Sequence, residues 1–144
     1  MIKVFTNVCA EILHIGHLNY LERAKKLGDY LIVGVNSDEM FYHYKKRWPI
    51  IPFEERKRII SALRIVDEVR EHTFPSQLDI FDGVDIVAMG PEWHQGKYKH
   101  QKKAKEYLLK KGIKLIELPR TPGISTTAIL ERAYREVEHW HQRS

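Results

Sequence analysis

The chain has 144 residues, of which 43% are hydrophobic and 30% charged, a balance typical of one globular domain over residues 1–144 and not of a disordered or collagen-like protein. Its single cysteine, Cys9, excludes an intramolecular disulfide and a cysteine-based zinc site, and the lack of a long apolar run or signal peptide predicts a cytoplasmic protein without membrane contact. The net charge of +5 predicts an anionic partner, either a phosphorylated small molecule or a nucleic acid.

Apolar β-branched runs alternate with longer amphipathic stretches, a pattern typical of a parallel sheet covered by helices. In chain order we expect a strand at 2–6, a helix at 17–27, a strand at 31–35, a helix at 52–65, a short edge strand at 67–70, a short helix at 77–81, a strand at 86–89, a helix at 99–111, a strand at 113–118 and a helix at 125–140. The connection at 40–51 is rich in aromatic and basic residues, and we expect a functional or mobile segment there. These elements predict an α/β fold of three layers, with a central parallel sheet of about five strands and helices on both faces.

Two histidines flank a glycine directly after the first expected strand, in the sequence His14-Ile15-Gly16-His17. Ligands of open parallel sheets bind beyond the carboxyl ends of the strands, and the N-terminus of the helix that follows favours a phosphate. Gly16 would let a phosphate approach without a Cβ in the way, and the imidazoles would donate to its oxygens. The alternative for the histidine pair is a capping or surface role.

A second motif, Arg120-Thr121-Pro122-Gly123-Ile124-Ser125-Thr126-Thr127, lies near the other end of the chain. Together with the HIGH sequence it resembles the HxGH and RTxGISTT signatures of the cytidylyltransferase family, above all the glycerol-3-phosphate type. The stretches 21–30, 66–69 and 89–93 resemble the same family in order and spacing, so the resemblance covers nearly the whole chain. It implies a Rossmann-like fold and the transfer of CMP from CTP to a phosphorylated alcohol by direct in-line attack, with release of pyrophosphate.

The resemblance also implies the site residues. The expected catalytic residues are His14, His17, Lys45 and Arg120. The expected nucleotide-binding residues are Cys9, Glu11, Gly16, Trp93, Arg120, Ser125 and Thr126. The expected ligands of the acceptor phosphate are Lys45, Arg47, Arg56 and Arg64.

Each assignment has an ordinary structural alternative. Ser125 is placed to cap its own helix, and Trp93 is a common kind of core or surface aromatic. Arg56 and Arg64 are eight residues apart on one expected helix, on nearly the same face, where a pair of exposed arginines is also common. The lysine-rich stretch 97–114 is expected to be a solvated face, with RNA binding as the least favoured alternative.

The chemistry implies Mg²⁺ that enters with CTP and is held mainly by the triphosphate, with no metal ligands from protein side chains. By resemblance we expect a homodimer that acts on small molecules, with no nucleic acid partner.

The segment Val8-Cys9-Ala10-Glu11 departs from the family, which has Gly-Thr-Phe-Asp there. This departure leaves two other functions open. One is an adenylyltransferase of the same fold that acts on a sugar phosphate or a flavin precursor, and the other is a nucleotide-binding protein that has lost catalysis. A nucleophilic Cys9, activated by the nearby helix N-terminus and histidines, is a further and less favoured alternative.

Overall fold

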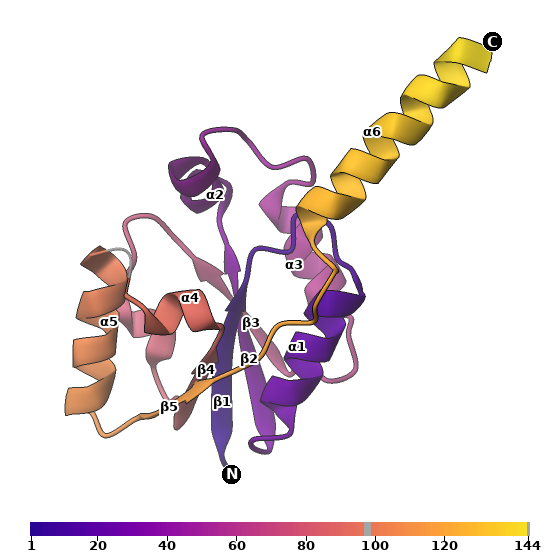
Figure 1. The fold of residues 1–144 in the computed structure, drawn as a ribbon. Helices are drawn as coiled ribbons and strands as arrows, with labels where there is room; N and C mark the ends of the chain where they lie inside the picture. The colour runs from indigo at the N-terminus through magenta and orange to yellow at the C-terminus, as the bar shows by residue number, and fades with distance from the viewer. Residues whose placement is uncertain (97–98, 144) are drawn as a thin grey trace.

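The computed structural model describes residues 1–96 and 99–143, and Figure 1 shows their fold. In chain order the elements are β1 (Lys3–Val8), α1 (Ile15–Lys25), β2 (Tyr30–Asn36), α2 (Asp38–Lys45), α3 (Phe53–Ser61), β3 (Glu68–His72), the 3-10 helix η1 (Leu78–Phe81), β4 (Ile86–Met89), α4 (Pro91–His94), α5 (Lys99–Lys110), β5 (Lys114–Glu117) and α6 (Thr126–Arg143). Lys97 and Tyr98 of the lysine-rich stretch lie outside the described residues.

The five strands form one parallel sheet in the order β3-β2-β1-β4-β5. The chain first builds outward from β1 to β3 and then returns to the other side of β1 with β4. The strand order therefore reverses between β1 and β4, and in open α/β sheets such a switch point is where ligands bind. The expected Rossmann-like fold is confirmed, and the strand predicted at the edge, β3, lies at an edge.

Helices cover both faces of the sheet (Figure 1). On one face, Val4 of β1 packs in a buried cluster with Leu21 of α1 and Ile60 of α3. On the other face, Phe5 of β1 belongs to a second cluster that includes Leu108 of α5. Because successive side chains of a strand point to opposite faces, the buried pair Val4 and Phe5 requires a layer of helices on each side.

Part of the segment predicted as a connection at 40–51 is the helix α2. Ser37 caps it, accepting a hydrogen bond from the backbone N–H of Met40 at 3.1 Å, and two acidic residues occupy its first turn. Met40 and Phe41 are buried on the inner side of the helix. The sequence Ser37-Asp38-Glu39 is a helix start, and the aromatic and basic residues that follow it masked this signal.

The helix predicted at 52–65 ends earlier, at Ser61. Arg64 is exposed and lies in the turn that leads to β3. Arg56 and Arg64 were expected on nearly the same face of one helix. This expectation is wrong, because Arg64 lies beyond the end of α3.

Helix α6 extends away from the body of the molecule (Figure 1). Residues 131–143 are all exposed, and none of the residues of α6 is buried. Among the described residues, no helix is both long and apolar enough to cross a membrane.

Candidate active site

The two histidines of the HIGH sequence cap helix α1. His14 is the N-cap, and its Nδ1 accepts a hydrogen bond from the backbone N–H of Gly16 at 3.0 Å. The Nδ1 of His17 accepts from the backbone N–H of His14 at 3.2 Å, which completes a reciprocal capping box. The two rings lie against each other with centroids 3.8 Å apart. The capping role, one of the alternatives for this histidine pair, is therefore confirmed for the two Nδ1 atoms.

Capping also fixes which nitrogen carries the proton. Since each Nδ1 is an acceptor, the proton of each neutral ring sits on Nε2, and both rings present an Nε2–H donor. Burial, followed by the charges of His14 and Arg120, lowers the pKa of His17 to about 4. Burial also lowers the pKa of His14. The pair is therefore a set of uncharged hydrogen-bond donors at neutral pH, held in place by the backbone of α1.

Gly16 is needed for a reason that the sequence analysis had not given. A Cβ at this position would lie 2.9 Å from Cε1 of the His14 ring and 3.5 Å from Cγ2 of Ile124. The glycine thus makes room for the capping imidazole, and it brings the segment of Ile124 close to the start of α1.

The segment 119–125 is fastened to α1. Asn19 Nδ2 donates to Thr121 Oγ1 at 3.1 Å, and Arg23 Nη1 donates to the carbonyl of Pro119 at 3.2 Å. Gly123 turns the chain with a φ of 76°, a conformation that favours glycine. The two sequence motifs, at opposite ends of the chain, therefore meet at one place.

Ser125 caps α6, because its Oγ accepts from the backbone N–H of Ala128 at 3.1 Å. This capping does not use the N–H groups of Thr126 and Thr127, which belong to the first turn of the helix and have no intrahelical partner. Those N–H groups and the positive end of the helix dipole are suited to bind an anion.

Arg120 forms an ion pair with Glu92, with Nη2 and Nε at 2.8 and 3.0 Å from Oε2. Their side chains are 65% and 59% exposed. Pairs this exposed contribute little to stability. The pair uses Nε and Nη2 of Arg120, so Nη1 can donate to a ligand while Glu92 stays bound. Trp93 lies in α4, packs against the cluster around Phe5, and faces a cavity described below.

Glu11 holds the basic segment that follows α2. Both oxygens of its buried carboxylate accept from Arg47, at 2.7 and 2.9 Å, and Oε2 also accepts from the backbone N–H of Ile50. The hydrogen bond from Arg47 is the main reason that the pKa of Glu11 lies below its usual value. Lys45 is exposed at the end of α2. In this structure the carboxylate of Glu11 is therefore occupied by Arg47 and by the backbone of Ile50.

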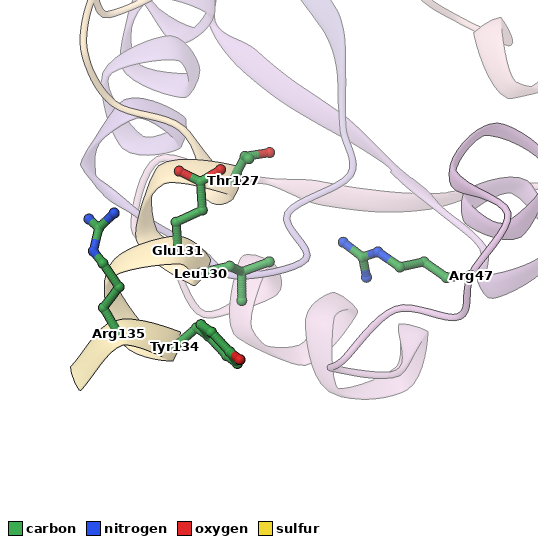
Figure 2. A pocket seen from close by; sticks show the side chains of 6 residues that line it. All are labelled: Arg47, Thr127, Leu130, Glu131, Tyr134 and Arg135. Atoms are coloured by element: carbon green, nitrogen blue, oxygen red, sulfur yellow. The ribbon is translucent and has the colours of Figure 1, made fainter. Parts of the chain in front are cut away.

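A cavity of about 400 Å³ separates Arg47 from the first turns of α6. Figure 2 shows Arg47 on one side of this space, with Thr127, Leu130 and Tyr134 on the other.

Arg56 is placed differently from its predicted role. Its side chain is only 1% exposed. Its guanidinium donates to the carbonyls of Ile51 and Cys9, at 2.9 and 2.7 Å, and to Oδ1 of Asp38 at 2.8 Å. Each of its three nitrogens thus has a protein acceptor, and Arg56 ties α3 to the loop after β1.

Cys9 does not have the environment of a nucleophile. Burial raises the pKa of its thiol to about 11, although the positive charge of Arg56 acts in the opposite direction. A lowered pKa, which the sequence analysis had considered, is therefore wrong, and the thiol stays protonated at neutral pH.

A polar cavity of about 180 Å³, which was not predicted from the sequence, lies at the carboxyl ends of the strands. Its lining includes Asn7 of β1, Asn36 of β2, His72 of β3 and Gly90 after β4, together with Arg120. Each of the first three is the last or next-to-last residue of its strand. Polar residues at strand ends are a signal that the sequence does contain. It was not recognised because the predicted strands ended one or two residues too early.

The described residues hold no group of three or more histidine, cysteine, aspartate or glutamate side chains that could bind a metal ion. The side chains at the motifs are instead uncharged donors and cations. This set is suited to the oxygens of a polyphosphate.

Comparison with known proteins adds a family and several relatives. The family profile described as Cytidylyltransferase-like matches residues 6–132. The glycerol-3-phosphate cytidylyltransferase of Bacillus subtilis (strain 168) is 40% identical over 134 residues, which cover 91% of this chain and 96% of that protein. The FAD synthase of Thermococcus kodakarensis is 36% identical and covers 91% of each chain. The bifunctional protein HldE of Helicobacter hepaticus is 37% identical over 92% of this chain, which spans 26% of that protein.

Among solved structures, the lipopolysaccharide core biosynthesis protein from Thermoplasma volcanium GSS1 is similar, with a TM-score of 0.67 and 28% sequence identity. The similarity covers 84% of this chain and 97% of that one.

Proposed function

The chain belongs to the cytidylyltransferase-like family of nucleotidyltransferases, and from this premise we propose that it transfers CMP from CTP to glycerol-3-phosphate. In this reaction an oxygen of the acceptor phosphate attacks the α-phosphorus of CTP. The bond from that phosphorus to the bridging oxygen of pyrophosphate breaks, and pyrophosphate leaves with the electron pair. No covalent bond to the protein is required.

The observation that carries this proposal is the meeting of the two motifs around uncharged donors. His14 and His17 present their Nε2–H groups, and Arg120 lies close enough to His17 to lower the pKa of that ring. Transfer at phosphorus needs alignment and charge neutralisation more than it needs a protein nucleophile. Donors whose positions are already fixed stabilise the developing charge without reorganising.

The remaining roles follow from position. The N–H groups at the start of α6 and the guanidinium of Arg120 would bind the triphosphate, and Lys45 would neutralise it from the other side. We propose that the triphosphate brings Mg²⁺ with it, as part of the substrate. The cytoplasmic location expected from the sequence stays a prediction.

An adenylyltransferase is the second candidate, since relatives named FAD synthase and HldE are nearly as similar as the cytidylyltransferase. The third candidate, a nucleotide-binding protein without catalysis, rests on the segment Val8–Glu11. In this structure that segment is built into the fold, because Val8 lies in a core cluster and Glu11 holds Arg47. These contacts give the segment a structural role in the fold.

The test is pyrophosphate release with Mg²⁺ and glycerol-3-phosphate, comparing CTP with ATP. We expect release with CTP, and we expect His17→Ala to lower kcat by about 100-fold or more, the cost of removing a preorganised donor. His139→Ala, which changes an exposed histidine of α6, is the matched control and should retain activity. Preference for ATP would identify an adenylyltransferase. CTP binding without pyrophosphate release would contradict the proposal and support the third candidate.

A further inference from the structure

A chain of hydrogen-bonded side chains crosses the carboxyl ends of three neighbouring strands. Ser76, in the loop after β3, lies 2.6 Å from Nε2 of His72. Nδ1 of His72 is 2.9 Å from Oδ1 of Asn7, and Nδ2 of Asn7 donates to Oδ1 of Asn36 at 2.8 Å. The active-site roles described above use none of these four side chains.

The donors and acceptors of these hydrogen bonds can be assigned in only one way. Oδ1 of Asn7 can only accept, so Nδ1 of His72 carries the proton and its Nε2 accepts from the hydroxyl of Ser76. Asn7 then donates to Oδ1 of Asn36, which accepts this hydrogen bond. Burial lowers the pKa of His72 to about 4, so the ring is neutral and carries one proton. Each amide oxygen thus already accepts one hydrogen bond from a neighbouring side chain, and the N–H groups of Asn7 and Asn36 that these bonds do not use are donors for a ligand.

The fold makes room for this arrangement at Gly34, which lies opposite Asn7 on β2. A Cβ at Gly34 would be 2.5 Å from Oδ1 of Asn7 and 2.7 Å from Cζ of Phe5. Any other residue there would displace the amide. The position of Asn7 is thus fixed by the sheet as well as by its hydrogen bonds.

Both amides line the polar cavity of about 180 Å³, which also contacts Gly90 and Arg120. The cavity therefore adjoins a group that we assign to the triphosphate. Its volume is below the range of roughly 300–1,000 Å³ that is usual for drug-sized ligands, and it suits a molecule of a few carbons. Among the described residues that line it, Glu92 is the one carboxylate, and it is paired with Arg120.

We propose that Asn7 and Asn36 select the acceptor, and that His72 and Ser76 are positioning residues that orient the two amides. The inference rests on the proposed function and deepens it. Donors at this cavity bind the lone pairs of hydroxyl oxygens on a short polyol phosphate. An acceptor with an ammonium group has no lone pair to offer and finds no unpaired carboxylate. Sites that hydrogen-bond a substrate reject analogues that leave buried polar groups unpaired.

The first test exchanges the donors of Asn36 for acceptors without changing its shape. Asn36→Asp keeps the oxygen that accepts from Asn7. We expect it to raise KM for glycerol-3-phosphate at least 10-fold, to leave KM for CTP within about 2-fold, and to improve phosphoethanolamine relative to glycerol-3-phosphate. Gln142→Glu, the same change of charge on exposed α6, should alter neither KM. An Asn36→Asp enzyme with an unchanged KM for the acceptor, or with equal losses for both acceptors, would overturn the proposal.

The second test addresses positioning. His72→Asn places an amide nitrogen where Nδ1 of histidine lies, so it retains the donor to Asn7, whereas His72→Leu removes it. We expect the leucine variant to raise KM for the acceptor more than it lowers kcat, and the asparagine variant to restore most of the loss. Equal effects of both variants would show that His72 serves only packing.

A binding measurement separates this inference from the reaction itself. The side-chain amide signals of Asn7 and Asn36, followed by nitrogen-15 NMR in the intact chain, should shift on titration with glycerol-3-phosphate in the presence of CTP and much less with phosphoethanolamine. If these shifts occur without turnover, the proposed function fails while the selection of the acceptor stands. If turnover occurs and the two amide signals do not respond, the selection by Asn7 and Asn36 is wrong.

Discussion

His17 and His72 couple the stability of the fold to pH. Burial is the main cause that lowers the pKa of each to about 4, from about 6.5 in the unfolded chain. Between these two values the unfolded state binds more protons, so the free energy of unfolding decreases as the pH falls. Over the interval from pH 6.5 to 5, each histidine should cost about 2 kcal/mol, at about 1.4 kcal/mol per pH unit.

Urea unfolding at pH 7 and at pH 5 measures this loss. We expect the wild type to be less stable at pH 5, and His17→Asn to remove part of the difference, since His72 and the other histidines whose pKa is lowered still contribute. His139→Asn is the control and should leave the difference unchanged, since His139 is exposed. The interval lies above the range in which carboxylates such as Glu11, whose pKa is lowered, take up protons. Equal stability at the two pH values would contradict the buried, neutral state of the histidines.

Helix α3 depends on a buried arginine. Arg56 connects it to the loop after β1, through the carbonyl of Cys9, and to Asp38 at the start of α2. Arg56→Met preserves much of the apolar volume but leaves these acceptors without their donor. We expect a loss of about 2–3 kcal/mol in the free energy of unfolding, since unpaired buried polar groups cost about 1–3 kcal/mol each.

The control is Arg58→Met, which removes an exposed arginine from the same helix and should change the stability by less than about 0.5 kcal/mol. The two variants also test the predicted role of Arg56 as a phosphate ligand. A large increase in KM for the acceptor with unchanged stability would favour that role over the structural one.

The elements show what the sequence could and could not predict. The parallel sheet followed from runs such as 31–35, because strands covered on both faces are continuously apolar. The meeting of the two motifs followed from a family resemblance, and their contacts are confirmed by pairs such as Asn19 and Thr121. The burial of Arg56 was not predictable, since an arginine in an amphipathic helix usually faces solvent. The pairing of Asn7 with His72 joins residues 65 positions apart, and no local pattern marks it.

At the scale of the whole molecule, the protruding helix α6 carries a stripe of apolar side chains. Leu130, Tyr134, Val137 and Trp140 recur at helical spacing along α6, and Tyr134 and Trp140 are 67% and 60% exposed. Charged residues of both signs flank the stripe: Glu131, Arg132, Arg135, Glu136, Glu138 and Arg143. An antiparallel pairing of two copies can bring an arginine of one helix near a glutamate of the other. This pattern is compatible with the homodimer that the resemblance implies, and it makes α6 the candidate interface.

Trp140→Glu tests this interface, because it replaces the largest apolar side chain of the stripe with a charge. We expect the wild type to sediment as a dimer at micromolar concentrations and the variant to sediment as a monomer. Trp48→Glu is the matched control, since Trp48 is 59% exposed but lies on the segment after α2. A wild type that is monomeric at high concentration would contradict the homodimer. A Trp140→Glu variant that remains dimeric would instead place the interface on another surface, because an isologous contact through α6 buries this position twice.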